Sequence, residues 1–190
     1  LLRVPCPIPR QWQGQMNLAS SAWAYPLIGA LVGLWGGAVY FICDWIAFSN
    51  IVSAGLALAA MILVTGALHE DGFADFWDSF GGQDRARRLE IMRDSRIGTF
   101  GTIGLIMSVG LRWSAMATFS DVVSLSAVLI AAGALSRSVC LVMMLFLVNA
   151  RNDGLGASAS GVKLPVLLLG CGLAVAISLL AVPFVQLVHF

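Results

Sequence analysis

Residues 20–42 read SSAWAYPLIGALVGLWGGAVYFI, and this stretch decides the class of fold. It contains no charged residue, and a helix crosses a bilayer with about 20 mostly apolar residues. Gly29, Gly33 and Gly37 repeat every four residues and therefore share one helix face. Glycine on such a face lets another helix approach closely. The stretch predicts a membrane-spanning helix that packs tightly against a neighbour.

Four more apolar runs follow along the chain: 46–68, which polar Ser49 and Asn50 interrupt, then 100–119, 122–148 and 164–188. Hydrophobic residues make up 59% of the 190 residues and charged residues only 11%, whereas soluble domains are about 25% charged. These runs predict an all-α fold: a polytopic integral membrane helix bundle with at least five transmembrane helices and no β-sheet. We expect residues 1–190 to form a single membrane domain.

Net charge, cysteines and chain ends add further expectations. The net charge of +1 gives no basic tail, so no nucleic-acid partner is expected. The cysteines form no C-x-x-C pair and read as small hydrophobic residues, not as a zinc site or a disulfide framework: Cys6, Cys43, Cys140 and Cys171. The chain begins at Leu1 without a signal-peptide pattern, and its last apolar run stops without a tail. We expect both ends to be trimmed.

Lysine and arginine lie on alternate links between the apolar runs. Two bases precede the first run, and the links after the first and third runs have none. The other bases outside the apolar runs lie between the second and third runs or between the fourth and fifth: Arg85, Arg87, Arg88, Arg93, Arg96, Arg151 and Lys163. Because such bases stay on the cytoplasmic side, the N-terminus and both polar loops are predicted to be cytoplasmic. The expected location is the inner or plasma membrane of a bacterium; a homo-oligomer is left open.

The longest polar stretch, 69–101, reads HEDGFADFWDSFGGQDRARRLEIMRDSRIGTFG and holds seven of the ten acidic residues. Asp71, Asp75 and Asp78 are spaced i, i+4, i+7, so a helix places them within a narrow arc. Like charges on one face repel unless a cation lies between them, and carboxylates are the ligands that Mg²⁺ takes together with substrate phosphates. We therefore predict a catalytic loop at about 69–98 with a Mg²⁺ site on these three aspartates. A solvated polar loop is the alternative.

The second half of this loop supplies cations. Arg93, Ser95 and Arg96 surround Asp94, which is predicted to complete the acidic metal cluster. Arginine suits bidentate phosphate recognition, so these three flanking residues are predicted to bind a phosphate substrate. Arg85, Arg87 and Arg88 can instead anchor the chain to anionic headgroups. The Gly81-Gly82 pair reads as a hinge between an acidic helix and a basic one.

Four polar residues outside the two acidic and basic segments are further candidates for the site: His69, Arg137, Arg151 and Asp153. His69 is a candidate general base or phosphate donor at the start of the loop. Arg137 lies in the middle of the fourth apolar run, where a charge normally faces the bundle interior, so we predict that it binds substrate phosphate. Arg151 and Asp153 lie in a glycine-rich loop that can offer N–H donors to phosphate. Arg112, towards the end of the third run, can snorkel and was assigned no role.

The loop resembles the cobalamin synthase family. The matching segments are His69-Glu70-Asp71-Gly72, Ala74-Asp75, Asp78, Gly81-Gly82, residues 89–98 (LEIMRDSRIG) and Gly101. The 151–157 loop and the Pro5-Pro7-Pro9 start are also similar to that family. Two features depart from it: Ser79 stands where glycine is frequent, and the family's C-terminal Gly-Asp-x-Leu-Gly-Ala motif is not found.

The resemblance implies a membrane transferase of vitamin B12 synthesis. It would join adenosylcobinamide-GDP to α-ribazole, or to its 5′-phosphate, and release GMP. Mg²⁺ on Asp71, Asp75, Asp78 and Asp94 would bind the pyrophosphate, and Arg93 and Arg96 would stabilise the leaving GMP. Such phosphoryl chemistry depends on positioning and charge neutralisation more than on covalent help.

Three other classes of membrane protein share some of these features. A CDP-alcohol phosphotransferase would carry Asp-Gly-x-x-Ala-Arg, but Asp75 stands where the arginine would be. A prenyltransferase would need a second D-x-x-D motif besides Asp75–Asp78, and none is found. A transporter would place its acids and arginines inside the spans, whereas most of the charge here lies in one loop.

Overall fold

The computed structural model describes residues 18–149 and 161–188, and these residues form helices and no strand. Four helices are long and apolar enough to cross a membrane: Ala19–Trp45, Thr99–Ala117, Val122–Phe146 and Leu164–Ala181. A fifth span is present if the bent pair Asn50–Thr65 and Leu68–Gly81 counts as one. The predicted all-α polytopic bundle is confirmed. By its internal contacts the chain divides into two compact units. That residues 1–190 form a single membrane domain stays a prediction.

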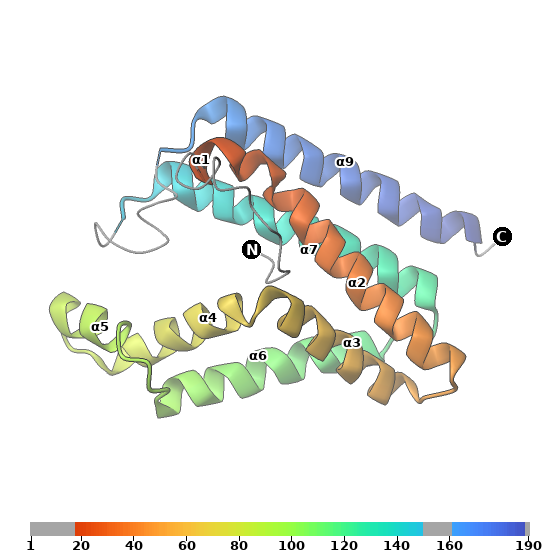
Figure 1. Ribbon diagram of the computed structural model, residues 1–190, viewed down its shortest axis with the longest axis horizontal. Helices are drawn as coiled ribbons and strands as arrows, with labels where there is room; N and C mark the ends of the chain where they lie inside the picture. Colours follow the sequence, from red (N-terminus) through yellow and green to blue (C-terminus); the bar gives the residue numbers. More distant parts are fainter. Residues whose placement is uncertain (1–17, 150–160, 189–190) are drawn as a thin grey trace, which may run out of the picture. The chain divides into compact units, whose positions relative to one another are not determined.

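One unit, Val39–Ser120, contains the polar loop of the sequence. Its elements are the end of α2 (Tyr25–Trp45), α3 (Asn50–Thr65), α4 (Leu68–Asp78), the 3-10 turn η3 (Ser79–Gly81), α5 (Arg85–Ile91) and α6 (Thr99–Ala117). The predicted order of an acidic helix, a glycine break and a basic helix is confirmed by α4, Gly82 and α5. Figure 1 shows α3 and α4 as an arch along α6.

The second apolar run is shorter than predicted and bent. A continuous helix was expected over 46–68, but α3 ends at Thr65 and α4 leaves it at 89°. Gly66 (φ 63°) and Ala67 (φ 54°) both have left-handed backbone conformations, and two such residues in succession cannot continue a right-handed helix. The Thr65 hydroxyl also donates to the Ile62 carbonyl at 2.9 Å. The left-handed backbone at Gly66 and Ala67 therefore ends the helix, directly after Thr65.

The arch of α3 and α4 runs antiparallel to α6. At the α3 end, the Trp113 indole donates to the Ile51 carbonyl at 2.7 Å. At the α4 end, Asp78 bonds to the start of α6. Only glycine fits at two positions of α6 that face α4. A Cβ atom on Gly101 would overlap Asp78, and a Cβ atom on Gly104 would overlap Trp77. Glycine on α6 thus permits the close approach of α4.

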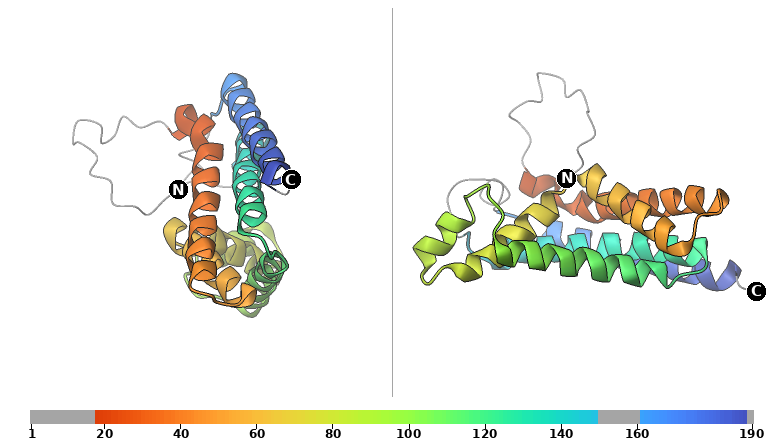
Figure 2. Two further views of the ribbon diagram at one scale, coloured as in Figure 1. Left: turned by 90° about the vertical axis from the view of Figure 1, so that its right-hand side faces the viewer. Right: turned by 90° about the horizontal axis from the view of Figure 1, so that it is seen from below.

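The second unit consists, in the described residues, of 18–38 with 121–149 and 161–188. It contains α1 (Leu18–Ser21), η2 (Ala22–Ala24), most of α2, α7 (Val122–Phe146) and α9 (Leu164–Val188). The views of Figure 2 show α7 and α9 side by side. A Cβ on Gly29 or Gly33 of α2 would overlap the α7 backbone at Gly133 or Leu129. The predicted role of this glycine face in helix packing is confirmed.

Candidate active site

Residues from α4, from α6 and from the segments just before these helices line one pocket of about 210 Å³. It lies within the first unit, beneath the bend between α3 and α4. The lining residues are Ala67, Glu70, Asp71, Ala74, Asp75, Ser95, Arg96, Ile97 and Leu105. Acidic side chains from one helix and a cation from a later segment thus meet in one cavity. A strained left-handed residue, Ala67, forms part of its wall, as is common at functional sites.

Asp71 and Asp75 lie in the wall of this pocket, as their spacing predicted. They are one helical turn apart on α4, so their carboxylates lie on the same face, about 40° apart around the axis. Ser95 and Arg96 line the same cavity, so a hydroxyl-bearing residue and a guanidinium-bearing residue share it with the two acids. A phosphate group with its counter-cation is the kind of ligand that such a mixed lining suits.

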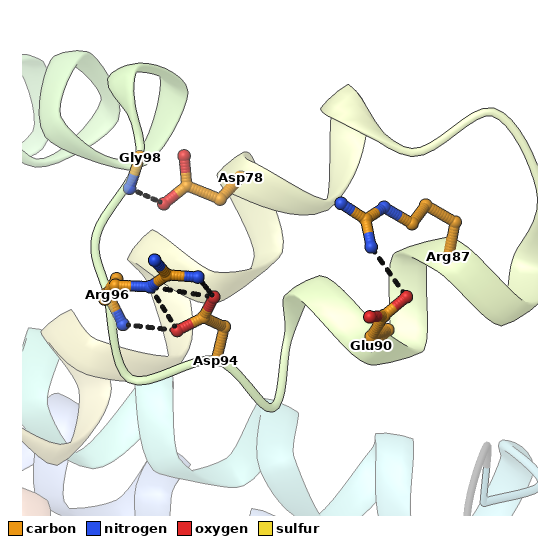
Figure 3. Close-up of polar contacts among 6 residues, drawn as sticks. All are labelled: Asp78, Arg87, Glu90, Asp94, Arg96 and Gly98. Atoms are coloured by element: carbon orange, nitrogen blue, oxygen red, sulfur yellow. Dashed lines mark hydrogen bonds and ion pairs between the residues drawn. The ribbon is translucent and has the colours of Figure 1, made fainter.

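Asp78, the third member of the predicted acidic face, makes a different set of contacts. One of its oxygens accepts the backbone N–H of Gly98 at 2.7 Å, and the other accepts that of Gly101 at 2.7 Å. Figure 3 shows the first of these bonds reaching from the end of α4 to the start of α6. The residues that line the pocket do not include Asp78. Its carboxylate caps α6, whose first N–H groups lack partners within the helix.

Asp94 and Arg96 form an ion pair at the edge of the site (Figure 3). The Arg96 Nη2 and Asp94 Oδ2 atoms are 2.7 Å apart, and Arg96 Nε bonds to both carboxylate oxygens. These hydrogen bonds lower the pKa of Asp94 to about 2. Because the pKa of Asp94 is depressed in the folded state, the ion pair stays formed through the pH range in which an ordinary carboxyl group titrates. It is lost only as the pH falls towards 2. It gives no pH dependence between pH 5 and 8.

Arg87 and Arg88 of the basic helix α5 make local contacts, one to Glu90 of the same helix and one to the Gly82 carbonyl just before it. Asp84 caps the helix by accepting the Arg87 N–H at 2.8 Å. Arg87 pairs with Glu90 at 2.7 Å, and both side chains are exposed. Arg88 Nε donates to the Gly82 carbonyl at 3.0 Å and closes the turn before the helix. None of these residues lines the pocket, which favours the anchoring role that the sequence left open for Arg87 and Arg88.

An ion pair that the sequence did not predict involves one of the residues that line the pocket, Glu70. Glu70 lines the pocket, and its side chain is only 12% exposed. Its Oε1 atom pairs with Arg112 Nη1 of α6 at 3.0 Å, so Arg112 has a partner and is not simply a snorkelling side chain. The signal in the sequence was Arg112 itself, because a charge in an apolar run needs a partner. The identity of that partner, 42 residues earlier, carries no local signature.

We expect Arg112→Ala to destabilise the protein. The variant leaves the mostly buried Glu70 carboxylate without its partner, and a stranded buried acceptor costs about 1–3 kcal/mol. The measurement is the thermal unfolding midpoint in detergent. Arg112→Lys, which keeps the charge, serves as the control and should lose less. An unchanged midpoint in Arg112→Ala would show that the pair does not hold α4 against α6.

The other predicted site residues fall outside the pocket lining or outside the described residues. His69 is half-buried in the first turn of α4, and Arg93 is exposed before α6. Arg137 lies in α7 of the second unit, where its Cγ atom is close to Gly29 of α2. Arg151 and Asp153 lie outside the described residues. The assignments of these residues stay predictions.

Comparison with known proteins decides the family. The family model described as cobalamin-5-phosphate synthase matches residues 1–190. This chain belongs to the cobalamin-5-phosphate synthase family. Its relatives include proteins named adenosylcobinamide-GDP ribazoletransferase from three bacteria. The Mesorhizobium japonicum protein is 42% identical over 84% of this chain and 67% of its own length. The Bradyrhizobium diazoefficiens protein is 48% identical over 75% and 55%, and the Sinorhizobium medicae protein 40% over 94% and 70%.

The chain of this cobalamin-5-phosphate synthase family member matches between 55% and 70% of the length of those three relatives. The resemblance drawn from the loop at 69–101 is therefore confirmed at the level of the family. No solved structure matches the chain.

The pocket of this family member offers two carboxylates to a Mg²⁺ ion, those of Asp71 and Asp75. Among the described residues, no group of three or more His, Cys, Asp or Glu is placed to hold a metal ion. The predicted four-aspartate set is thus not gathered in this structure. Mg²⁺ commonly takes only one or two carboxylates and completes its shell with water and substrate phosphate. Asp71 and Asp75, in one wall beside Arg96, fit that simpler arrangement.

Proposed function

We propose that this protein is a membrane transferase that joins adenosylcobinamide-GDP to α-ribazole, or to its 5′-phosphate, and releases GMP. Two lines support the proposal. The chain belongs to the cobalamin-5-phosphate synthase family, and its relatives carry the name of that activity. The observation that carries it is the pocket in which Asp71 and Asp75 meet Ser95 and Arg96.

The proposed reaction is a phosphoryl-type transfer. A hydroxyl oxygen of the ribazole forms a bond to the phosphorus that is linked to cobinamide. The bond from that phosphorus to the oxygen of the GMP phosphate breaks, and GMP leaves with the electron pair. The hydroxyl proton is lost to a base. Such a transfer gains most from positioning and from neutralising charge on phosphate oxygens.

Each group in the pocket has a role in this proposal. Asp71 and Asp75 would hold Mg²⁺, which supplies a Lewis acid that neutralises the pyrophosphate. Arg96 would bind a phosphate oxygen of the leaving GMP: Asp94 engages its Nε and Nη2 atoms, and a guanidinium has donors besides these two. The Ser95 hydroxyl adds one donor beside it. His69 remains the candidate base.

The test of this function uses the full-length protein in a membrane environment. Supplied with adenosylcobinamide-GDP, α-ribazole and Mg²⁺, it should release GMP and form a cobalamin in equal amounts. Omission of α-ribazole is the control for hydrolysis, which would release GMP without forming a cobalamin. Absence of both products from folded protein would overturn the proposal.

We also propose that the protein lies in the bacterial inner membrane with its N-terminus and the polar loops at 69–98 and 149–163 on the cytoplasmic side. The support is the placement of lysine and arginine on alternate links. The described helices agree in number with that arrangement if α3 and α4 together make one crossing. The link 118–121 between α6 and α7 would then face the outside.

Cysteine labelling tests this orientation. In intact cells, an impermeant maleimide should fail to label Ser95→Cys and should label Ser120→Cys, which lies in the link after α6. Both positions are exposed, so topology alone separates them. Each variant is compared with the protein that lacks the introduced cysteine. The opposite labelling pattern would reverse the orientation.

A further inference from the structure

The carboxylate of Asp78 joins two helices that are distant in sequence. Its two oxygens accept the N–H groups of Gly98 and Gly101, each at 2.7 Å. These groups belong to the N-cap and the first turn of α6, where N–H groups have no partner within the helix. A carboxylate at this end also meets the positive end of the helix dipole. Asp78 therefore caps α6 from the end of α4.

The two glycines make this contact sterically possible. A Cβ atom on Gly98 or on Gly101 would overlap the Asp78 carboxylate. A Cβ atom on Gly101 would also lie 2.9 Å from the Ala74 carbonyl oxygen of α4. Two glycines and one aspartate thus form a single tight joint between α4 and α6, and any larger residue at either glycine would displace the carboxylate.

The joint lies next to the pocket in sequence. Ser95, Arg96 and Ile97 line the pocket, and Gly98 follows directly. Holding the Gly98 N–H therefore fixes one end of the segment that carries the pocket's only cation among the described lining residues. The other wall, with Asp71 and Asp75, belongs to the same helix α4 that carries Asp78. One helix thus presents both the acids and the joint that sets the opposing cation.

We infer that Asp78 is a positioning residue that holds Ser95 and Arg96 against the carboxylates of Asp71 and Asp75, and that it is not a metal ligand. The effect of Asp78 on turnover rests on the proposed function, whereas the contact between Asp78 and the start of α6 does not depend on it. The D-x-x-D segment Asp75–Asp78 is accordingly divided: Asp75 faces the pocket and Asp78 faces the amides of α6. The charge that the sequence assigned to Mg²⁺ stabilises the start of a helix.

The joint can be tested without any assay of activity. In hydrogen-exchange mass spectrometry of the purified full-length protein, Asp78→Ala should speed exchange in peptides that cover residues 95–101, because two amides lose their acceptor. Gly98→Ala should do the same while keeping every carboxylate. Gly110→Ala is the matched control. Gly110 lies on the same helix, and a Cβ atom there would have no neighbour within 4 Å. Unchanged exchange in both Asp78→Ala and Gly98→Ala would overturn the joint.

Kinetics then separate positioning from metal binding. Two charge-assisted hydrogen bonds predict that Asp78→Ala lowers kcat/KM by about 10- to 100-fold. In an Arg96→Ala background, the same change should add less than about threefold, because the charged group that Asp78 positions is already gone and only the neutral Ser95 hydroxyl is left. The Mg²⁺ concentration for half-maximal turnover should stay the same in Asp78→Ala and rise in Asp71→Asn.

A large rise in the Mg²⁺ midpoint of Asp78→Ala would contradict the inference and restore Asp78 as a ligand. Fully additive losses in the Arg96→Ala background would contradict it as well. If the wild-type protein itself forms no cobalamin, the proposed function fails. The exchange experiment still decides whether the joint exists, so the two failures are distinguishable.

Discussion

Replacing Asp71 or Asp75 by alanine is expected to lower turnover by about 10²–10³-fold, the loss seen when one electrostatic contact to a transition state is removed. Both carboxylates line the pocket beside Arg96. Without either one, the two phosphates of the substrate would face a cation site with half its protein charge. Folding should be retained, because removing one of two neighbouring acids also removes a repulsion on α4. The measurement is GMP release by the full-length protein at saturating Mg²⁺.

Glu90→Ala is the matched control for these two variants. Glu90 is an acid of the same polar stretch, but it is exposed and pairs only with Arg87 among the ion pairs described. Its loss should leave turnover within about twofold, because exposed pairs contribute little. Excess chelator should stop the wild-type protein, and added Mg²⁺ or Mn²⁺ should restore it. Full turnover in chelator, or a Glu90→Ala loss equal to that of Asp71→Ala, would sink the metal site.

The fold class was predictable because a membrane-spanning helix requires a long run of apolar residues, which is visible in the sequence. Four of the five apolar runs correspond to helices whose ends differ from the predicted bounds by at most five residues, as for 20–42 against α2, which ends at Trp45. Only helices and closed barrels satisfy their backbone groups in lipid, so about 20 apolar residues leave little choice. The glycines on the first run also conveyed their role, since close packing is what glycine adds there.

The bend between α3 and α4 was not predictable by the same means. Hydropathy averages over a window, and the run 46–68 stays apolar on average across Gly66 and Ala67. Gly66 is the one local signal at the break, since glycine often ends a helix in the left-handed conformation. What ends α3 is a pair of left-handed residues, and alanine gives no warning of that conformation. The break matters for the site, because Ala67 at the bend and Glu70 in the first turn of α4 both line the pocket.

The candidate site was predicted in part for a similar reason. Helical spacing correctly placed Asp71 and Asp75 on one face, since that depends on 3.6 residues per turn alone. Spacing cannot say what faces that arc, and α6 presents two backbone N–H groups to Asp78. The Glu70–Arg112 pair also depends on tertiary packing across 42 residues. Local periodicity identified the acids, while long-range packing decided what each of them contacts.

Arg96→Lys is expected to cut turnover by about 10²-fold, corresponding to a lost transition-state contact of roughly 2–4 kcal/mol. Arg96 engages Asp94 through its Nε and Nη2 atoms and lines the pocket. An ammonium group cannot hold Asp94 through a planar fork and bind a phosphate oxygen at the same time. The side chain is 87% exposed, so its pair adds little to stability and the loss should appear in turnover.

Arg87→Lys is the matched control, and it should keep near-normal turnover. Arg87 is also exposed and also pairs with a nearby acid, Glu90, at 2.7 Å, but it does not line the pocket. An anchoring arginine tolerates lysine because a headgroup reads mainly its charge. Arg93 does not line the pocket either, so Arg93→Lys tests the sequence-based prediction that it binds phosphate, under which it should behave like Arg96→Lys. All variants are compared at equal membrane insertion. Near-normal turnover in all three would mean that these arginines only anchor the chain and that the site lies elsewhere.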